Sequence, residues 1–113
     1  MQIILYHNKN CSKSKMCKKL LEDNKINFKL MDYLKNPLTK TEIKKILSNL
    51  NGDLVEILRD SKFKNKNRKI SIAEVTDIIF KSPNLMQRPI VFLKRFYICR
   101  PPEKIFEILD KQN

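Results

Sequence analysis

The chain begins with an alternation between a short apolar run and a longer segment with helical spacing. Residues 2–6 form an apolar run followed by polar residues, a pattern that predicts a strand and a turn. From Ser12 to about Ile26, apolar residues recur at helical spacing and lysines occupy many of the other positions, which predicts an amphipathic helix. Residues 28–33 predict a second strand. The inward stripe of the helix is expected to consist of Met16, Cys17, Leu20 and Leu21.

The middle of the chain predicts helices that begin with capping boxes. Thr39 and Glu42 have the spacing at which a hydroxyl and a carboxylate bind the free amides of a first helical turn, and Ser71 and Glu74 repeat it. Apolar residues at helical spacing follow each box. A further short helix is predicted over residues 54–59.

The last third of the chain predicts a β-hairpin and a final helix. Residues 89–93 and 96–99 are apolar runs separated by Lys94 and Arg95, which is short enough for a hairpin turn. Two prolines then begin a helix, a position that proline favours. Its inward residues are expected to be Ile105, Phe106 and Leu109.

The predicted order is therefore β-α-β, then three helices, then β-β-α. Without the middle helices, this is the plan of an α/β thioredoxin-like fold whose first two strands are parallel. A chain of 113 residues suits one domain. We expect a single domain over residues 1–113, with a helical insertion at about residues 38–82.

The composition excludes several classes of protein. The longest apolar run is far shorter than the roughly 18 residues of a membrane span, and the first residues lack the pattern of a signal peptide, so we expect a cytoplasmic protein without a membrane partner. The single glycine, Gly52, excludes glycine-rich phosphate loops, and the single histidine, His7, excludes paired-histidine metal sites. We expect a monomer with no bound cofactor and no metal.

Positive charge is the most unusual property of the composition. Lys and Arg number 24 against 12 Asp and Glu, giving a net charge of +12. Cations occur without any acid in residues 9–19, 62–69 and 81–100. Residues 62–69 have little apolar content and predict a solvated loop. Nucleic-acid binding is not expected, because the sequence lacks interleaved aromatic residues or a recognisable binding module.

Cys11 lies between the first predicted strand and the first predicted helix. The free amides and dipole at a helix N-terminus stabilise an anion, so we expect the pKa of this thiol to lie below its ordinary value of about 8.5. Nearby cations add positive potential, namely Lys9, Lys13 and Lys15. The same amides, with the hydroxyls of Ser12 and Ser14, are expected to form a cradle for an oxyanion.

The other two cysteines have different expected roles. Cys17 lies on the inward stripe of the first helix and is expected to be a core residue. It would lie about 9 Å further along the helix axis than Cys11, beyond the Cα separation of about 7 Å that a disulfide allows. The direction of Cys99 stays open. A zinc site of His7 with all three cysteines is disfavoured, because no Cys-x-x-Cys pair is present.

The segment Tyr6-His7-Asn8-x-x-Cys11-Ser12-x-Ser14-Lys15 resembles the active-site segment of the glutaredoxin-dependent arsenate reductase family. Three later segments are similar to the family's three arginine positions, in the same order and over essentially the whole chain. They are Leu58-Arg59, Arg88-Pro89-Ile90-Val91 and Cys99-Arg100-Pro101.

This resemblance implies that Cys11 is a nucleophile that attacks the central atom of an oxyanion. The clamp for the oxyanion would consist of Arg59, Arg88 and Arg100, whose planar, permanently charged forks suit a tetrahedral dianion. The implied substrate is arsenate or a similar oxyanion, with glutathione as co-substrate and glutaredoxin as partner. Supporting roles are implied for His7, Asn8, Lys15 and Pro89. The resemblance also implies a cis bond before Pro89.

Some residues depart from the family pattern and leave the substrate open. Lys9 and Lys15 stand where many members have proline and arginine. The main alternative is a glutathione-linked thiol-disulfide oxidoreductase of the same fold with no arsenate activity. A second alternative is a redox-responsive regulator, but such regulators resemble a Cys-x-x-Cys pattern, and Ser14 stands at its second position here.

Overall fold

The computed structural model describes residues 2–60, 63 and 69–111. The chain separates into two compact units, a first unit of Met1–Pro37 and Arg88–Asn113 and a second unit of Leu38–Gln87. The second unit takes in the segment predicted as a helical insertion. The solvated loop predicted at residues 62–69 lies, apart from Phe63 and Lys69, outside the described residues.

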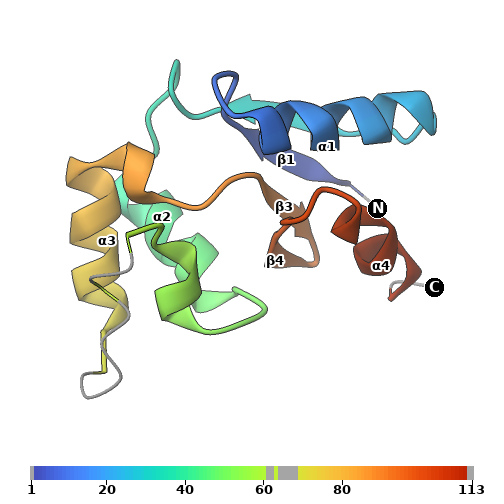
Figure 1. The fold of residues 1–113 in the computed structure, drawn as a ribbon. Helices are drawn as coiled ribbons and strands as arrows, with labels where there is room; N and C mark the ends of the chain where they lie inside the picture. The colour runs from blue at the N-terminus through green and yellow to red at the C-terminus, as the bar shows by residue number, and fades with distance from the viewer. Residues whose placement is uncertain (1, 61–62, 64–68, 112–113) are drawn as a thin grey trace. The chain divides into compact units, whose positions relative to one another are not determined.

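The first unit is built on a four-stranded sheet with the order β2-β1-β3-β4 (Figure 1). Its strands are β1 (Ile4–His7), β2 (Lys29–Asp32), β3 (Ile90–Leu93) and β4 (Arg95–Ile98). β1 is parallel to β2 and antiparallel to β3, and β3 is antiparallel to β4. A parallel pair needs a crossover, which α1 (Ser12–Asp23) supplies. This arrangement confirms the predicted thioredoxin-like α/β fold.

One face of this sheet is covered by α1 and by α4 (Lys104–Asp110). Side chains alternate along a strand, so Leu5 enters this core while its neighbours Ile4 and Tyr6 point to the other face. Complete burial of one such aliphatic side chain is worth about 1.5 to 3 kcal/mol. The core of the first unit contains Ile3, Leu5, Cys17, Leu21, Val91, Leu93, Tyr97, Cys99, Ile105 and Ile108.

Two side chains predicted to face inward are exposed. Met16 is 45% exposed and Phe106 is 38% exposed. The buried stripe of α1 runs through Ser14, Cys17 and Leu21, and that of α4 through Ile105 and Ile108. Successive helical residues differ by about 100° in direction, so a residue adjacent to a narrow stripe points away from it. The buried stripes of α1 and α4 are therefore narrower than the sequence pattern predicted.

The hairpin turn between β3 and β4 is tighter than predicted. Leu93 and Arg95 are paired across the ladder, so only Lys94 lies in the turn, at φ 66°. A positive φ at a residue with a side chain is uncommon. The sequence suggested that Arg95 lies in the turn, but Arg95 is the first residue of β4.

The second unit contains α2 (Lys40–Ser48), η1 (Leu54–Ile57), α3 (Ile72–Lys81) and η3 (Pro83–Leu85). Both predicted helix starts are confirmed: the Thr39 hydroxyl accepts the Glu42 N–H, and the Ser71 hydroxyl accepts the Glu74 N–H. At the first of these, Glu42 also accepts the Thr39 N–H, which completes a capping box. α2 and α3 contact each other. The short helix predicted at 54–59 is a 3-10 helix.

Candidate active site

Cys11 is the N-cap residue of α1 and has an extended backbone. Its N–H donates to the Asn8 carbonyl at 3.1 Å, and its own carbonyl accepts the Lys15 N–H at 3.0 Å. The Asn8 side chain accepts the Asn10 N–H at 2.9 Å, which closes the turn. These bonds hold the sulfur at the first turn of the helix, and the Cys11 residue is only 9% exposed.

The pKa of the Cys11 thiol lies below its ordinary value. Burial alone raises this pKa, but it is outweighed by the backbone N–H groups of Ser14 and Lys13 and by the Arg88 side chain, all of which hydrogen-bond the sulfur. A lowered pKa increases the thiolate fraction at neutral pH. The direction agrees with the sequence-based expectation. Its main causes are helix amides and one arginine, whereas the sequence had pointed also to lysine side chains.

Arg100 also reaches the sulfur. Its Nη1 lies 3.9 Å from Cys11 Sγ and donates to the Arg88 carbonyl oxygen at 3.0 Å. Two guanidinium groups, from Arg88 and Arg100, therefore contact one sulfur. The bond between Arg88 and Pro89 is cis, as expected, and the bond between Arg100 and Pro101 is also cis.

The sheet explains how Arg88 and Arg100 meet. Arg88 precedes β3 and Arg100 follows β4, and the antiparallel hairpin pairs Ile90 with Ile98 at this end. The Cys99 N–H extends the pairing by donating to the Pro89 carbonyl at 3.0 Å. Tyr6 of β1 pairs with Ile90, which brings the loop after β1 to the same edge.

Arg59, the third predicted clamp residue, lies in the second unit just after η1. Its backbone N–H donates to the Leu85 carbonyl at 2.8 Å. Its role in the clamp stays a prediction. The same is true of Ser12 and Lys15, both of which are exposed on α1.

Ser14 occupies a different position from the one expected. Its side chain is fully buried, and its hydroxyl oxygen accepts the Asn8 N–H at 3.0 Å and lies 2.7 Å from His7 Nδ1. The hydroxyl therefore ties the loop to the helix and is not free for an oxyanion. Only the backbone N–H of Ser14 faces the sulfur. This corrects the prediction of a Ser14 hydroxyl in the cradle, and the reason is that Ser14 lies on the buried stripe of α1.

His7 supports this loop through its contact with the Ser14 hydroxyl. It is 7% exposed, and burial lowers its pKa, assisted by Lys18 and Lys15 and opposed by Asp32. A neutral imidazole can accept the Ser14 O–H at Nδ1, whereas an imidazolium cannot. This contact gives His7 a place in the hydrogen bonding of the loop.

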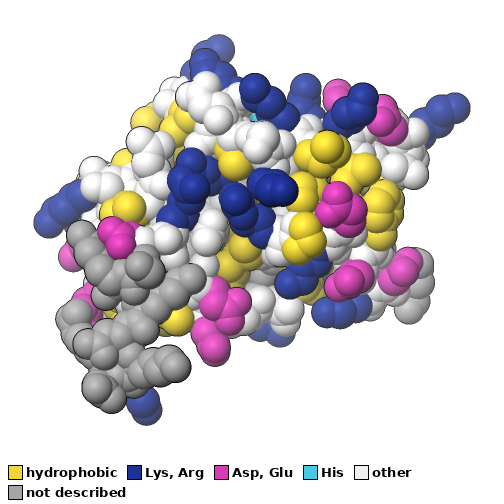
Figure 2. Space-filling view, in the orientation of Figure 1, with side chains coloured by type: hydrophobic (Ala, Val, Ile, Leu, Met, Phe, Trp, Pro, Cys, Tyr) yellow, Lys and Arg dark blue, Asp and Glu magenta, His cyan; other side chains and the backbone are white. Residues whose placement is uncertain are grey.

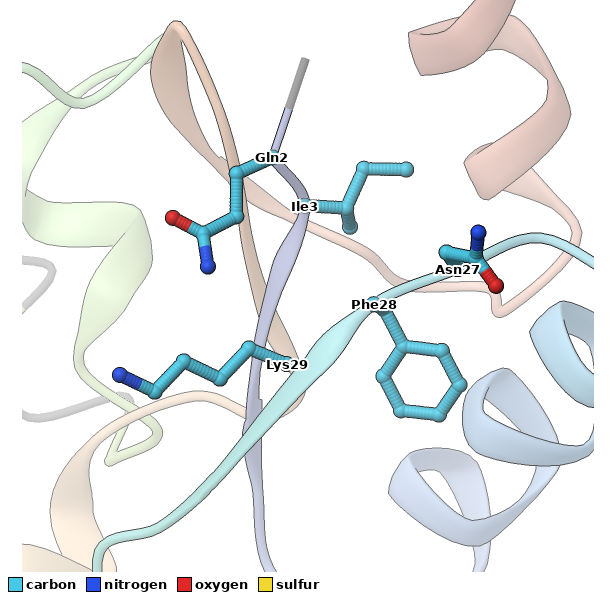
Figure 3. Close-up of a pocket in the computed structure, with 5 residues that line it drawn as sticks. All are labelled: Gln2, Ile3, Asn27, Phe28 and Lys29. Carbon is cyan, nitrogen blue, oxygen red and sulfur yellow. The ribbon is translucent and has the colours of Figure 1, made fainter.

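A pocket of about 500 Å³ lies at the start of β1 and β2, lined by Gln2, Ile3, Asn27, Phe28 and Lys29 (Figure 3). Because the two strands are parallel, this is the opposite end from Cys11, which follows β1. Figure 3 shows Gln2 and Lys29 extending to one side of the strands and Phe28 to the other. Its polar groups do not converge, so it is a weaker candidate for a functional site.

Neither a metal site nor a membrane-spanning helix is found among the described residues. No group of three or more His, Cys, Asp or Glu side chains there is arranged to hold a metal ion. None of the helices in that part of the chain is long and apolar enough to cross a bilayer. Lys and Arg side chains occur both at the centre and at the edge of the face in Figure 2, with acidic side chains among them.

Sheet topology and the position of Cys11 at the start of α1 together define a thioredoxin-like protein. Within that class, the ArsC family model matches residues 6–108. The chain belongs to the ArsC family. The resemblance predicted from the cysteine segment and the three arginines is therefore confirmed at the level of the family.

Relatives in this family carry two kinds of name. The arsenate reductase of Haemophilus influenzae is 34% identical over 116 residues, covering 96% of this chain and 100% of that protein. The solved structure of an arsenate reductase from Vibrio cholerae has a TM-score of 0.78 at 28% identity and covers 96% of this chain and 98% of that one. The regulatory protein MgsR of Bacillus subtilis is 29% identical over 118 residues, covering 99% of this chain and 94% of that protein.

Proposed function

We propose that this protein is an arsenate reductase that uses Cys11 as its nucleophile. The observation that carries the proposal is the convergence of Arg88 and Arg100 on the Cys11 sulfur at the start of α1. The guanidinium groups stabilise the thiolate before substrate arrives. Their remaining N–H donors can then bind the oxygens of a tetrahedral oxyanion in planar, bidentate geometry.

The first step forms a bond between sulfur and arsenic. The Cys11 thiolate attacks arsenic(V), and one arsenate oxygen takes up protons and leaves as water. The amides of Lys13 and Ser14, which hydrogen-bond the sulfur, stay in place while negative charge moves from sulfur to the arsenate oxygens. Preorganised donors of this kind lower the barrier because they need no rearrangement during the step. The family resemblance implies a third arginine, Arg59, whose part in the clamp stays a prediction.

Reduction needs two electrons, which we assign to two sulfur atoms. A glutathione thiolate attacks Cys11 Sγ, the sulfur–arsenic bond breaks, and its electron pair stays on arsenic, giving arsenite and a Cys11–glutathione disulfide. A second glutathione, delivered with glutaredoxin, releases Cys11 and leaves glutathione disulfide. The glutathione of the cytoplasm is kept largely reduced, so the proposal places the protein there. We propose that it acts as a monomer.

The direct test is arsenite production by the purified protein with arsenate, glutathione and glutaredoxin. Turnover that disappears in Cys11→Ser supports the proposal. Omission of glutaredoxin or of glutathione identifies the donor. A wild-type protein that is folded by circular dichroism and forms no arsenite above the protein-free rate would contradict it.

The similarity to MgsR supports a second candidate, a redox thiol protein or regulator without arsenate turnover. The assay for it is reduction of a glutathionylated peptide with glutathione alone. Peptide reduction without arsenite formation favours this candidate. The buried Ser14 counts against a disulfide switch at the first turn, because no second thiol is available there.

A further inference from the structure

A groove of about 320 Å³ lies beside Arg100 in the first unit and is lined by Arg100, Pro101, Glu103, Lys104 and Glu107. These residues come from one stretch of chain, the segment that follows β4 and the first turn of α4. Arg100 is shared between the groove and the thiol, since its Nη1 is 3.9 Å from Cys11 Sγ. One side chain, that of Arg100, therefore both lines the groove and contacts the Cys11 sulfur.

The groove is lined by charges of both signs. Its lining contains two cations, Arg100 and Lys104, and two carboxylates, Glu103 and Glu107. The last three side chains are exposed, and none belongs to the ion pairs found among the described residues. Glu103 and Glu107 stand four residues apart in helical backbone, a spacing at which like charges destabilise a helix. A cationic group bound between them would relieve that repulsion.

We propose that this groove binds glutathione, the electron donor, in an inference that rests on the proposed function. Glutathione carries one ammonium group, two carboxylates and a central thiol, and its charged groups are ionised at neutral pH. By charge, the ammonium group would pair with Glu103 and Glu107, and a carboxylate would pair with Lys104. A tripeptide of about 10 Å held there directs its central thiol toward Cys11.

The same charges disfavour the substrate as occupant. An arsenate dianion in this groove would lie against two carboxylates, and such like-charge contacts are unfavourable. A donor of mixed charge has no such conflict. The groove and the clamp therefore differ in the ligand they suit, although Arg100 belongs to both.

The test uses a reaction that needs no arsenate. In it, the Cys11 thiolate attacks one sulfur of glutathione disulfide, a Cys11–glutathione disulfide forms, and a glutathione thiolate leaves. The second-order rate is measured by intact-mass spectrometry. A parallel reaction with bis(2-hydroxyethyl) disulfide, which has no charged group, reports the intrinsic reactivity of Cys11. The ratio of the two rates measures recognition of glutathione.

Lys104→Ala should lower this ratio about fivefold, as expected for the loss of one exposed charge contact. Lys111→Ala is the matched control, because it removes the same charge from the C-terminal end of α4 outside the groove. Equal losses in the two variants would assign the effect to long-range attraction and overturn the proposal.

For Glu107→Gln, the proposal and overall charge predict opposite changes in the rate of attack on glutathione disulfide. Removing a carboxylate should speed attack on an anionic disulfide if only overall charge matters. The proposal expects a slower reaction, about threefold to fivefold, because the ammonium group loses its partner. Asp110→Asn is the control and should be slightly faster or unchanged. A faster reaction of Glu107→Gln would overturn the proposal.

These outcomes separate the groove from the proposed function. A protein that shows the Lys104 and Glu107 effects but makes no arsenite binds glutathione and is not an arsenate reductase. A protein that makes arsenite and shows neither effect has the proposed function with its donor bound elsewhere.

Discussion

Cys17 Sγ lies 3.7 Å from Cys99 Sγ, and both residues are fully buried. The Cys17 S–H donates to the Cys99 sulfur, and the Cys99 S–H donates to the Pro102 carbonyl at 3.5 Å. The pKa of Cys99 is strongly raised, chiefly by the hydrogen bond with Cys17 and secondly by burial. This pair joins α1 to the segment that carries Arg100. For Cys11, by contrast, burial raises the pKa but hydrogen bonds from helix amides and Arg88 bring it below its ordinary value, so Cys11 and Cys99 are shifted in opposite directions.

Brief alkylation at neutral pH should therefore modify Cys11 selectively. We expect Cys11 to react at least about tenfold faster than Cys99, since one pKa unit changes the thiolate fraction tenfold and Cys99 is also inaccessible. Peptide mass spectrometry after a short iodoacetamide pulse measures the three sites. Unfolded protein in urea is the control, in which all three should react. Equal labelling of the folded protein would contradict this expectation.

Arg88→Lys and Arg100→Lys should each lower arsenate turnover by about 10² to 10³, because lysine keeps the charge but loses the bidentate fork. Arg95→Lys, in β4, is the matched control and should change turnover little. The fold of each variant is checked by circular dichroism. An effect of Arg95→Lys as large as the other two would mean that the clamp is assigned to the wrong arginines.

Cys17→Ala and Cys99→Ala should retain turnover with glutathione and glutaredoxin, because reduction of Cys11 is external in our proposal. Each should lower the free energy of unfolding by about 1 kcal/mol, as for removal of a small buried group. Urea unfolding measures this cost. Mass mapping of oxidised protein provides the opposing result: a Cys11 disulfide to either residue, with turnover lost in that variant, would show internal resolution.

Ser14→Ala should destabilise the protein by about 1 to 3 kcal/mol, because it leaves the buried Asn8 N–H without its acceptor. Turnover should fall as well, since the loop no longer holds its geometry. Ser12→Ala is the control, and as an exposed residue at the start of α1 it should change stability by less than about 1 kcal/mol. Similar urea midpoints for wild type and Ser14→Ala would contradict the role given to this hydroxyl.

Acid should destabilise the protein partly through His7. Its folded pKa is lowered, so as the pH falls below about 6.5 the unfolded chain binds the proton first and stability decreases. The stabilising contribution is complete above the unfolded pKa and is lost as the pH falls toward the folded one. Urea midpoints between pH 7.5 and 5 should decrease less steeply in His7→Gln than in wild type. Parallel curves would exclude His7 as a contributor.

Local sequence was sufficient for the order of the elements and for the position of Cys11. The helix that begins at Thr39 depends on a hydroxyl and a carboxylate three residues apart, and both contacts form within one turn. Cys11 likewise follows a strand and precedes a helix, so its place beside free amides could be predicted from neighbours alone. Interactions of such short range depend only on residues close together in the sequence, so the sequence alone predicts them.

Only the tertiary structure determined which residues far apart in the chain contact one another. Arg88 and Arg100 reach one sulfur only because β3 and β4 pair antiparallel beside β1. Cys99 turns inward to Cys17 because of the same pairing and the packing of α1 against the sheet. These contacts join residues far apart in the chain, and their geometry depends on the register of strands and the rotation of helices. A single sequence suggests which residues have the right chemistry, and only the packed sheet and helices determine which of them meet.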